Sequence, residues 1–118
     1  MYVRTSHWKC KTEFEEESIR LFEKLVFKTM ESEPDCLAMQ LMGEGQDRIA
    51  VTVFSSEDAY RSWKKRTGDI KGITDAFAHM YLDGVPPRPF DYMLLASKIY
   101  DRDRNGGRDL SLAQASQR

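Results

Sequence analysis

The residues of this chain that could perform acid–base or metal chemistry are few and widely spaced. Two histidines, His7 and His79, and two cysteines, Cys10 and Cys36, occur among 118 residues. They form none of the HxH, HxxxH or CxxC spacings typical of zinc sites, so we expect no protein-bound metal. An imidazole titrates near neutral pH. His7 and His79 are therefore the candidate catalytic residues, as acid, base or proton shuttle.

Each histidine also has a simpler interpretation. His7 belongs to a strand-like run and lies on the face opposite Trp8, so it is catalytic only if that face meets a pocket; otherwise it is a half-exposed strand residue. His79 follows Phe77 and precedes Met80. These apolar neighbours suit a heme ligand, whereas a position at a helix C-terminus suits a histidine that the helix dipole favours.

Aromatic residues are more numerous in this chain than histidines and cysteines. Trp63, Tyr60 and Phe77 lie in helical stretches, and aromatic-lined pockets suit flat hydrophobic ligands. Ordinary core packing explains the same residues equally well, because large aromatic side chains fill cores. We expect Ser6, Tyr60, Trp63 and Phe77 to bind substrate, if a pocket exists beside them.

The order of predicted elements indicates the architecture that must position these residues. The pattern predicts strands over residues 2–9, 37–42, 48–54 and 90–97, and helices over 12–30, from Ser55 onward, and over 73–80. A β-α-β-β-α-β order is typical of the ferredoxin-like split βαβ fold, an α+β class with a four-stranded antiparallel sheet.

Local signals refine this prediction. Thr12 and Glu15 are spaced as a capping box for the first helix. Leu37, Met39 and Leu41 should share one face of the second strand. The first two strands of this fold run parallel, so Cys10 and Cys36 should lie at opposite ends of the sheet, too far apart for a disulfide.

Composition restricts the class of protein. A chain of 118 residues holds one domain, and a net charge of −1 argues against nucleic-acid binding. No apolar run reaches the roughly 20 residues of a membrane span, and the first residues lack the apolar segment of a secretory signal. We expect a cytoplasmic protein with a domain over residues 1–98 and a polar tail over 99–118 that is mobile or packs on a partner subunit.

The run Phe54-Ser55-Ser56-Glu57-Asp58-Ala59-Tyr60-Arg61-Ser62-Trp63 carries a family resemblance. A strand that ends in an aromatic residue, a Ser cap and an Ala-aromatic-x-x-Trp helix resemble the antibiotic-biosynthesis monooxygenase superfamily, and the similarity covers about residues 2–98. This resemblance implies a dimeric α+β barrel, in which two sheets pack face to face. It also implies that each subunit keeps a pocket between its own sheet and helices.

Heme-degrading monooxygenases are more distant relatives in this resemblance. They combine the Trp of the second helix with an Asn on the first strand and a downstream His that ligates heme iron. Trp63 matches the Trp, but Ser6 stands where the Asn would be. Ile73 occupies the expected position of the His, and His79 lies six residues later.

The resemblance implies a monooxygenase acting on a small planar aromatic or quinol-type substrate, with no cofactor or, alternatively, with heme. A non-catalytic module of the same fold that binds a small ligand is the second hypothesis. A structural protein whose tail docks on another chain is the third. We expect a homodimer that binds a small aromatic or hydrophobic molecule, and neither nucleic acid nor membrane.

Overall fold

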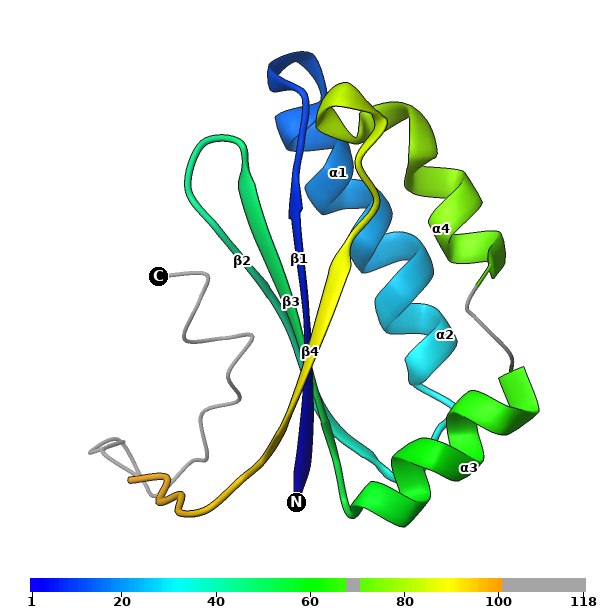
Figure 1. Cartoon of the computed structure of the whole chain (residues 1–118), viewed down its shortest axis with the longest axis vertical. Helices are drawn as coiled ribbons and strands as arrows, with labels where there is room; N and C mark the ends of the chain where they lie inside the picture. The colour runs from blue at the N-terminus through cyan, green and yellow to red at the C-terminus, as the bar shows by residue number, and fades with distance from the viewer. Residues whose placement is uncertain (68–70, 101–118) are drawn as a thin grey trace, which may run out of the picture.

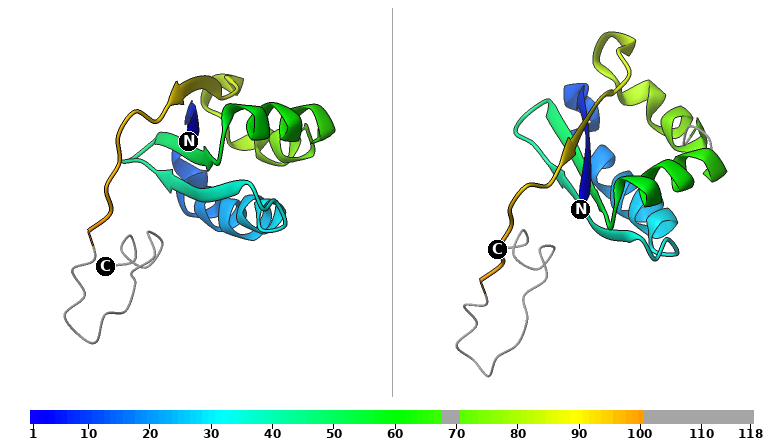
Figure 2. Two further views of the ribbon diagram at one scale, coloured as in Figure 1. Left: turned by 90° about the horizontal axis from the view of Figure 1, so that it is seen from below. Right: turned by 60° about the horizontal axis from the view of Figure 1, so that its bottom comes forward.

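The chain forms two layers, a twisted antiparallel sheet and a set of helices that covers one of its faces (Figure 1). The computed structural model describes residues 1–67 and 71–100. Seen from the end of the sheet, all helices of these described residues lie on the same side, and none of them covers the other face (Figure 2). The α+β, ferredoxin-like prediction is confirmed.

The strands are β1 (Tyr2–Lys9), β2 (Cys36–Met42), β3 (Asp47–Phe54) and β4 (Arg88–Met93), in the spatial order β2-β3-β1-β4. β1 is central and antiparallel to both neighbours, so that Tyr2 lies opposite Phe54 and Met93. Side chains alternate between the two faces of a strand. Tyr2, Arg4, Ser6 and Trp8 therefore face the helices, and Val3, Thr5 and His7 lie on the opposite face, hereafter the open face.

The long helical segment after β1 is not a uniform α-helix. A 3₁₀ turn (Thr12–Phe14) leads into α1 (Glu15–Leu21), a π-helical segment (Phe22–Phe27) and α2 (Lys28–Met30). The predicted capping box is wrong: Thr12 lies inside the first turn, and its hydroxyl accepts a hydrogen bond from Gln46 Nε2 (3.1 Å). The hairpin packed beside this turn thus supplies the partner that the helix backbone was expected to provide.

A tight turn joins β2 to β3, and two glycines are required in it. A Cβ on Gly43 would lie 1.9 Å from the carbonyl oxygen of Asp47, and Gly45 has a φ of +57°. In β2 the register shifts between Cys36 and Ala38, so Leu37 is 52% exposed. Leu37 therefore does not share the core-facing side of β2 with Met39 and Leu41, contrary to the sequence prediction.

The second helical region begins as predicted. The backbone N–H of Ala59 donates to Ser56 Oγ (3.0 Å) at the start of α3 (Glu57–Thr67). α4 (Lys71–Phe77) follows, and two 3₁₀ turns (Ala78–Met80 and Leu82–Gly84) lead to β4.

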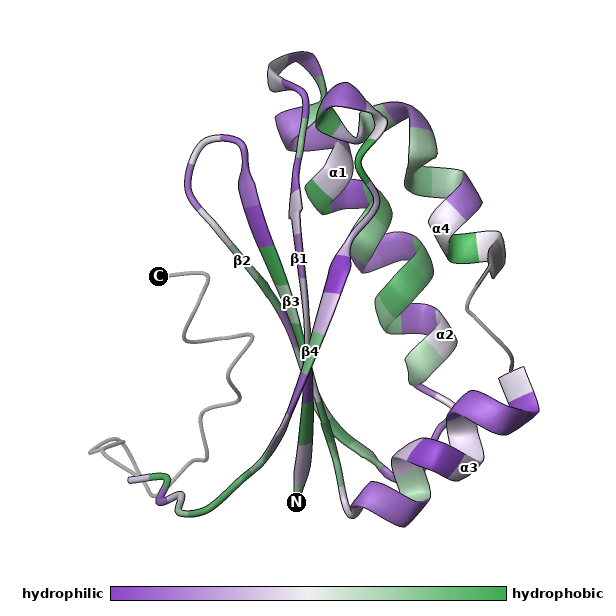
Figure 3. Cartoon of the chain, viewed as in Figure 1, coloured by the Kyte–Doolittle hydropathy of each residue, from purple (hydrophilic) through white to green (hydrophobic). Residues whose placement is uncertain are grey.

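β4 begins two residues earlier and ends four residues earlier than the predicted range 90–97. It pairs with β1 as far as Tyr2, and the last backbone hydrogen bond runs from Leu94 N–H to Met1 C=O (2.9 Å). Residues 94–100 leave the sheet as an extended segment, and its hydrophobic positions are visible in Figure 3. Most of the predicted tail, residues 101–118, lies outside the described residues.

Two aromatic clusters hold the helices on the sheet. Trp8 packs edge-on against Phe77 and Tyr81, with ring centroids 5.8 and 5.3 Å away. Phe54 and Trp63, 5.3 Å apart, anchor α3 at the other end. Among residues 1–67 and 71–100, no helix is long and apolar enough to cross a membrane.

Candidate functional site

A cavity of about 610 Å³ lies between the sheet and the helices. Its floor is the helix-facing side of β1 and β3, and its walls come from the π-helical segment, α3, α4 and the Pro-rich connector before β4. Most of its lining is apolar or aromatic, as is typical of small-molecule sites. The lining includes Trp8, Phe22, Phe54, Trp63, Phe77 and Tyr81.

Three of the four residues predicted to bind substrate line this cavity. Ser6 lies on the floor, and Trp63 and Phe77 contribute walls from α3 and α4. Tyr60, on α3, is buried and is not part of the lining; its ring stacks on Tyr2 with ring centroids 5.0 Å apart. The structure thus brings Ser6, Trp63 and Phe77 together around one space, and connects Tyr60 to it through Arg4.

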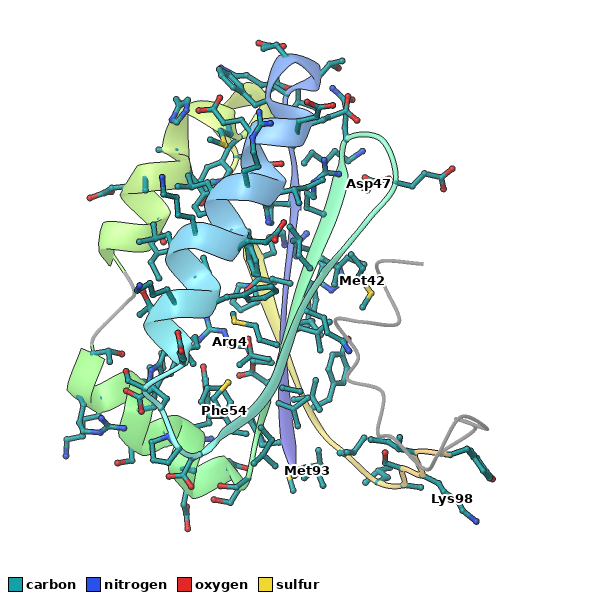
Figure 4. All side chains as sticks on the ribbon, turned by 180° about the vertical axis from the view of Figure 1, so that it is seen from behind. Arg4, Met42, Asp47, Phe54, Met93 and Lys98 are labelled. Carbon is teal, nitrogen blue, oxygen red and sulfur yellow. The ribbon has the colours of Figure 1, made fainter. Side chains whose placement is uncertain are left out.

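Arg4 is the cation of the cavity floor. Its Nη1 donates a hydrogen bond to the Tyr60 hydroxyl (2.5 Å), and its guanidinium carbon lies 5.5 Å from the centre of the Tyr60 ring. Figure 4 shows Arg4 and Phe54 between the sheet and the helices, whereas Met42 points away from them. Across the residues that the structure describes, no carboxylate forms an ion pair with Arg4.

Asp75 and Tyr81 are the other ionisable groups of the lining. Asp75 lies on α4 and is exposed. Burial, and then the charge of Asp75, raise the pKa of Tyr81 to about 12. The phenol therefore stays protonated at neutral pH and can donate a hydrogen bond. Asp75 is the only carboxylate among the described lining residues.

Neither candidate catalytic histidine lines the cavity. His7 lies on the open face, where its ring meets Phe90 edge-on at 5.0 Å and its Nε2 is 3.1 Å from Thr5 Oγ1. The Thr5 hydroxyl donates to Phe90 C=O (3.0 Å), so it accepts from His7 Nε2–H. His79 is exposed and packs edge-on against Phe14, with ring centroids 5.0 Å apart. The catalytic roles of both histidines stay predictions.

The cavity does not fit a heme held by an imidazole. No histidine or cysteine is among its described lining residues, and Tyr81, with its raised pKa, is a poor source of a phenolate ligand. Over residues 1–67 and 71–100, no group of three His, Cys, Asp or Glu side chains is placed to hold a metal ion. Cys36, whose pKa is raised by burial, lies at the other end of the sheet from Cys10.

Sequence reasoning missed Arg4, Thr52, Asp75 and Tyr81 as parts of the site. Arg4 carried a usable signal: it shares the strand face of Ser6 and Trp8, so placing Ser6 in a pocket places Arg4 there too. Thr52 lies directly opposite Arg4 on β3. Asp75 and Tyr81 had no such signal, because α4 and the turns after it reach the cavity only through tertiary packing.

At the level of sequence, no family model matches this chain and no curated protein is similar to it. Solved structures are similar in fold. A monooxygenase from the gene ActVA-Orf6 of Streptomyces coelicolor, in complex with the ligand nanaomycin D, matches with a TM-score of 0.68 and 14% identity, over 84% of this chain and 91% of that one.

Two further solved structures are also similar to this chain in fold. A proposed antibiotic biosynthesis monooxygenase from Deinococcus radiodurans has a TM-score of 0.67 and 12% identity, with 85% of this chain and 98% of that chain covered. One from Caulobacter crescentus CB15 has a TM-score of 0.66 and 19% identity, with 80% and 90% covered. At these identities the similarity concerns the fold alone. The resemblance to this superfamily is therefore confirmed as a resemblance of fold.

Proposed function

We propose that this chain is a cofactor-independent monooxygenase that acts on a small planar aromatic or quinol-type substrate in the cavity between sheet and helices. The observation that carries the proposal is the cavity itself, walled by Trp8, Phe54, Trp63 and Phe77. A similar fold holds nanaomycin D in the Streptomyces coelicolor monooxygenase. Apolar walls exclude water, which keeps a reactive intermediate from side reactions.

The reaction needs a base and an oxidisable substrate rather than a resident cofactor. A substrate that loses a proton can give electrons to O₂. An activated CH₂ then becomes C=O with one oxygen atom of O₂, and the other atom leaves as water, so the substrate supplies all the electrons. Asp75 is placed to receive the proton, and Ser6 and Thr52 offer hydroxyls on the cavity floor.

Oxygen uptake with 1,8-dihydroxyanthrone as the probe tests this proposal. We expect uptake by the purified protein with formation of the anthraquinone, and a fall of about 10²-fold or more in kcat for Asp75→Asn. Asp58→Asn is the matched control, because Asp58 is an exposed carboxylate of α3 outside the cavity. Uptake no faster than the uncatalysed oxidation, in a folded protein, would contradict the proposal.

A non-catalytic module that binds the same class of ligand is the second candidate. It is favoured by the placement of His7 and His79, which leaves the described lining without an imidazole. In that case aromatic ligands raise the Tm, but no product forms. Adding hemin tests the heme hypothesis separately from these two candidate functions. We expect no Soret shift, because the cavity offers no histidine ligand.

A homodimer completes the proposal. The open face carries Val3, Val51, Val53, Phe90 and Tyr92, and no helix in the part of the chain that the structure describes covers it (Figure 2). An apolar sheet face of this extent is normally buried against another layer. A second copy packed on it in an isologous contact forms the α+β barrel that the resemblance implies. The cytoplasmic location and the role of residues 99–118 stay predictions.

A further inference from the structure

We propose that the cavity selects planar aromatic ligands that carry a carboxylate, and that Arg4 is the residue that recognises it. This inference rests on the proposed function for the location of the ligand site, and it names the substrate class of that site. Its basis is the placement of one guanidinium on the floor of a largely apolar cavity. A cation is costly to bury among aromatic rings unless an anion or a polar ligand balances it.

The charges near Arg4 leave it uncompensated. Asp91 is its cross-strand neighbour on β4, but within the described residues the Asp91 carboxylate forms no ion pair with Arg4. Asp75 is exposed on α4 and forms no ion pair with Arg4 in the part of the chain described. Thr52, opposite Arg4 on β3, is neutral.

The guanidinium is held in place but retains free donors. Tyr60 accepts from Nη1, and among the described residues it is the only hydrogen-bond partner of the Arg4 side chain. An arginine has five N–H donors in a planar fork that matches the two oxygens of a carboxylate. The remaining donors therefore suit a carboxylate whose attached ring system lies against the aromatic walls.

Tyr60 is the positioning residue in this arrangement. Its hydroxyl and its ring both contact Arg4, while Tyr2, Phe54 and Trp63 pack around the ring. This packing limits the rotamers of both side chains. The buried Tyr60, predicted from the sequence to bind substrate, thus acts on the ligand through Arg4.

Binding of two nearly isosteric probes, naphthalene-2-carboxylate and naphthalene-2-carboxamide, tests the inference. We expect the wild type to bind the carboxylate at least about tenfold more tightly, as a charge-assisted hydrogen bond predicts. In Arg4→Met this preference disappears while amide binding is retained. Arg4→Lys keeps part of it, because the charge remains but the fork is lost. Tyr60→Phe reduces the preference without abolishing it.

Arg20→Met is the matched control, because Arg20 is an exposed cation of α1 that pairs with Glu16 on the helix surface and lies outside the cavity lining. The preference of this variant for the carboxylate probe over the amide probe should equal that of the wild type. Equal affinity of the wild type for the two probes, or an unchanged preference in Arg4→Met, overturns the inference. Should Arg4→Met fail to fold, Arg4→Lys decides in the same assay. Neither probe requires turnover, so a protein that shows no oxygen uptake can still show the preference, and the two proposals fail separately.

Discussion

Two arginines project from the central strands toward the helices, and their partners determine what each can do. Arg48 is 6% exposed, and its Nη atoms donate to the backbone carbonyls of Gly45, Asp47 and Glu15 at 2.7, 2.8 and 3.3 Å. It therefore ties the β2–β3 turn to the start of α1. Arg4 has one side-chain hydrogen-bond partner among the described residues, and it lines the cavity. The same residue type is structural in one place and available to a ligand in the other.

Replacing Arg48 tests its structural role. Arg48→Met should lower the free energy of unfolding by about 1–3 kcal/mol, because three backbone carbonyls lose a charged donor. The desolvation cost of the guanidinium offsets part of this loss, since Arg48 Nε is buried without a partner. Urea unfolding with an unchanged m-value measures the effect. A midpoint equal to that of the wild type would mean that the three carbonyls find other partners.

Tyr81 gives the protein an alkaline dependence of stability. Its folded pKa is raised to about 12 from an ordinary value of 10.0, so the folded state holds the phenolic proton more tightly than the unfolded state. This contribution is complete below pH 10 and is lost as the pH rises toward 12. We expect the free energy of unfolding to fall across this interval, and to fall less in Tyr81→Phe. An equally steep fall in that variant would assign the effect to other groups, such as Tyr2.

The elements that matter most to the site are those that depart from regular geometry. The π-helical segment Phe22–Phe27 places Phe22 and Val26 in the cavity wall, and such segments are frequent at functional sites. The hairpin depends on Gly43, where the Asp47 carbonyl approaches the Cα closely. The sequence pattern predicted a helix and a turn in these places. It did not predict the change to π-helical geometry or the close approach of the Asp47 carbonyl to Gly43.

Gly43→Ala should destabilise the protein by about 1–3 kcal/mol, because the added methyl group forces the Asp47 backbone to move. Gly72→Ala is the matched control. A Cβ at Gly72, in α4, meets nothing within 4 Å, so the same substitution there should be stabilising by up to about 1 kcal/mol through helix propensity. Thermal unfolding of both variants measures whether each substitution lowers or raises the stability. A Gly43→Ala protein as stable as the wild type would show that the turn relaxes freely.

At the scale of the whole molecule, the proposed homodimer would bury the open face of the sheet, which no helix of the described residues covers. Met42 is 45% exposed, Phe90 39% and Tyr92 53%, and all three lie on the open face. Figure 4 shows Met42 on the side of the sheet away from the helices. The helix-covered face holds the cavity, so assembly through the open face leaves that site accessible.

Val51→Glu should convert the proposed homodimer to a monomer, because Val51 lies on the open face of β3, opposite Thr5, and a buried charge without a partner is costly. Light scattering or sedimentation measures the mass. Ser62→Glu, on the exposed side of α3, should remain dimeric. A stable wild-type monomer would remove the dimer from the proposal and leave the cavity, within one subunit, unaffected.

The sequence by itself determined the order of the elements, the span of β1, a Ser cap before the second helical region and the placement of Trp63 and Phe77 on helices, because these depend on contacts within a few residues. Tertiary structure decided the rest. Alternation separates His7 from Trp8, but only the packing of the helices shows which face they cover. The extent of β4 is set by its pairing with β1, a strand some eighty residues away in the sequence. Arg4, Asp75 and Tyr81 meet at one cavity because distant segments fold against one sheet, and no local pattern records that meeting.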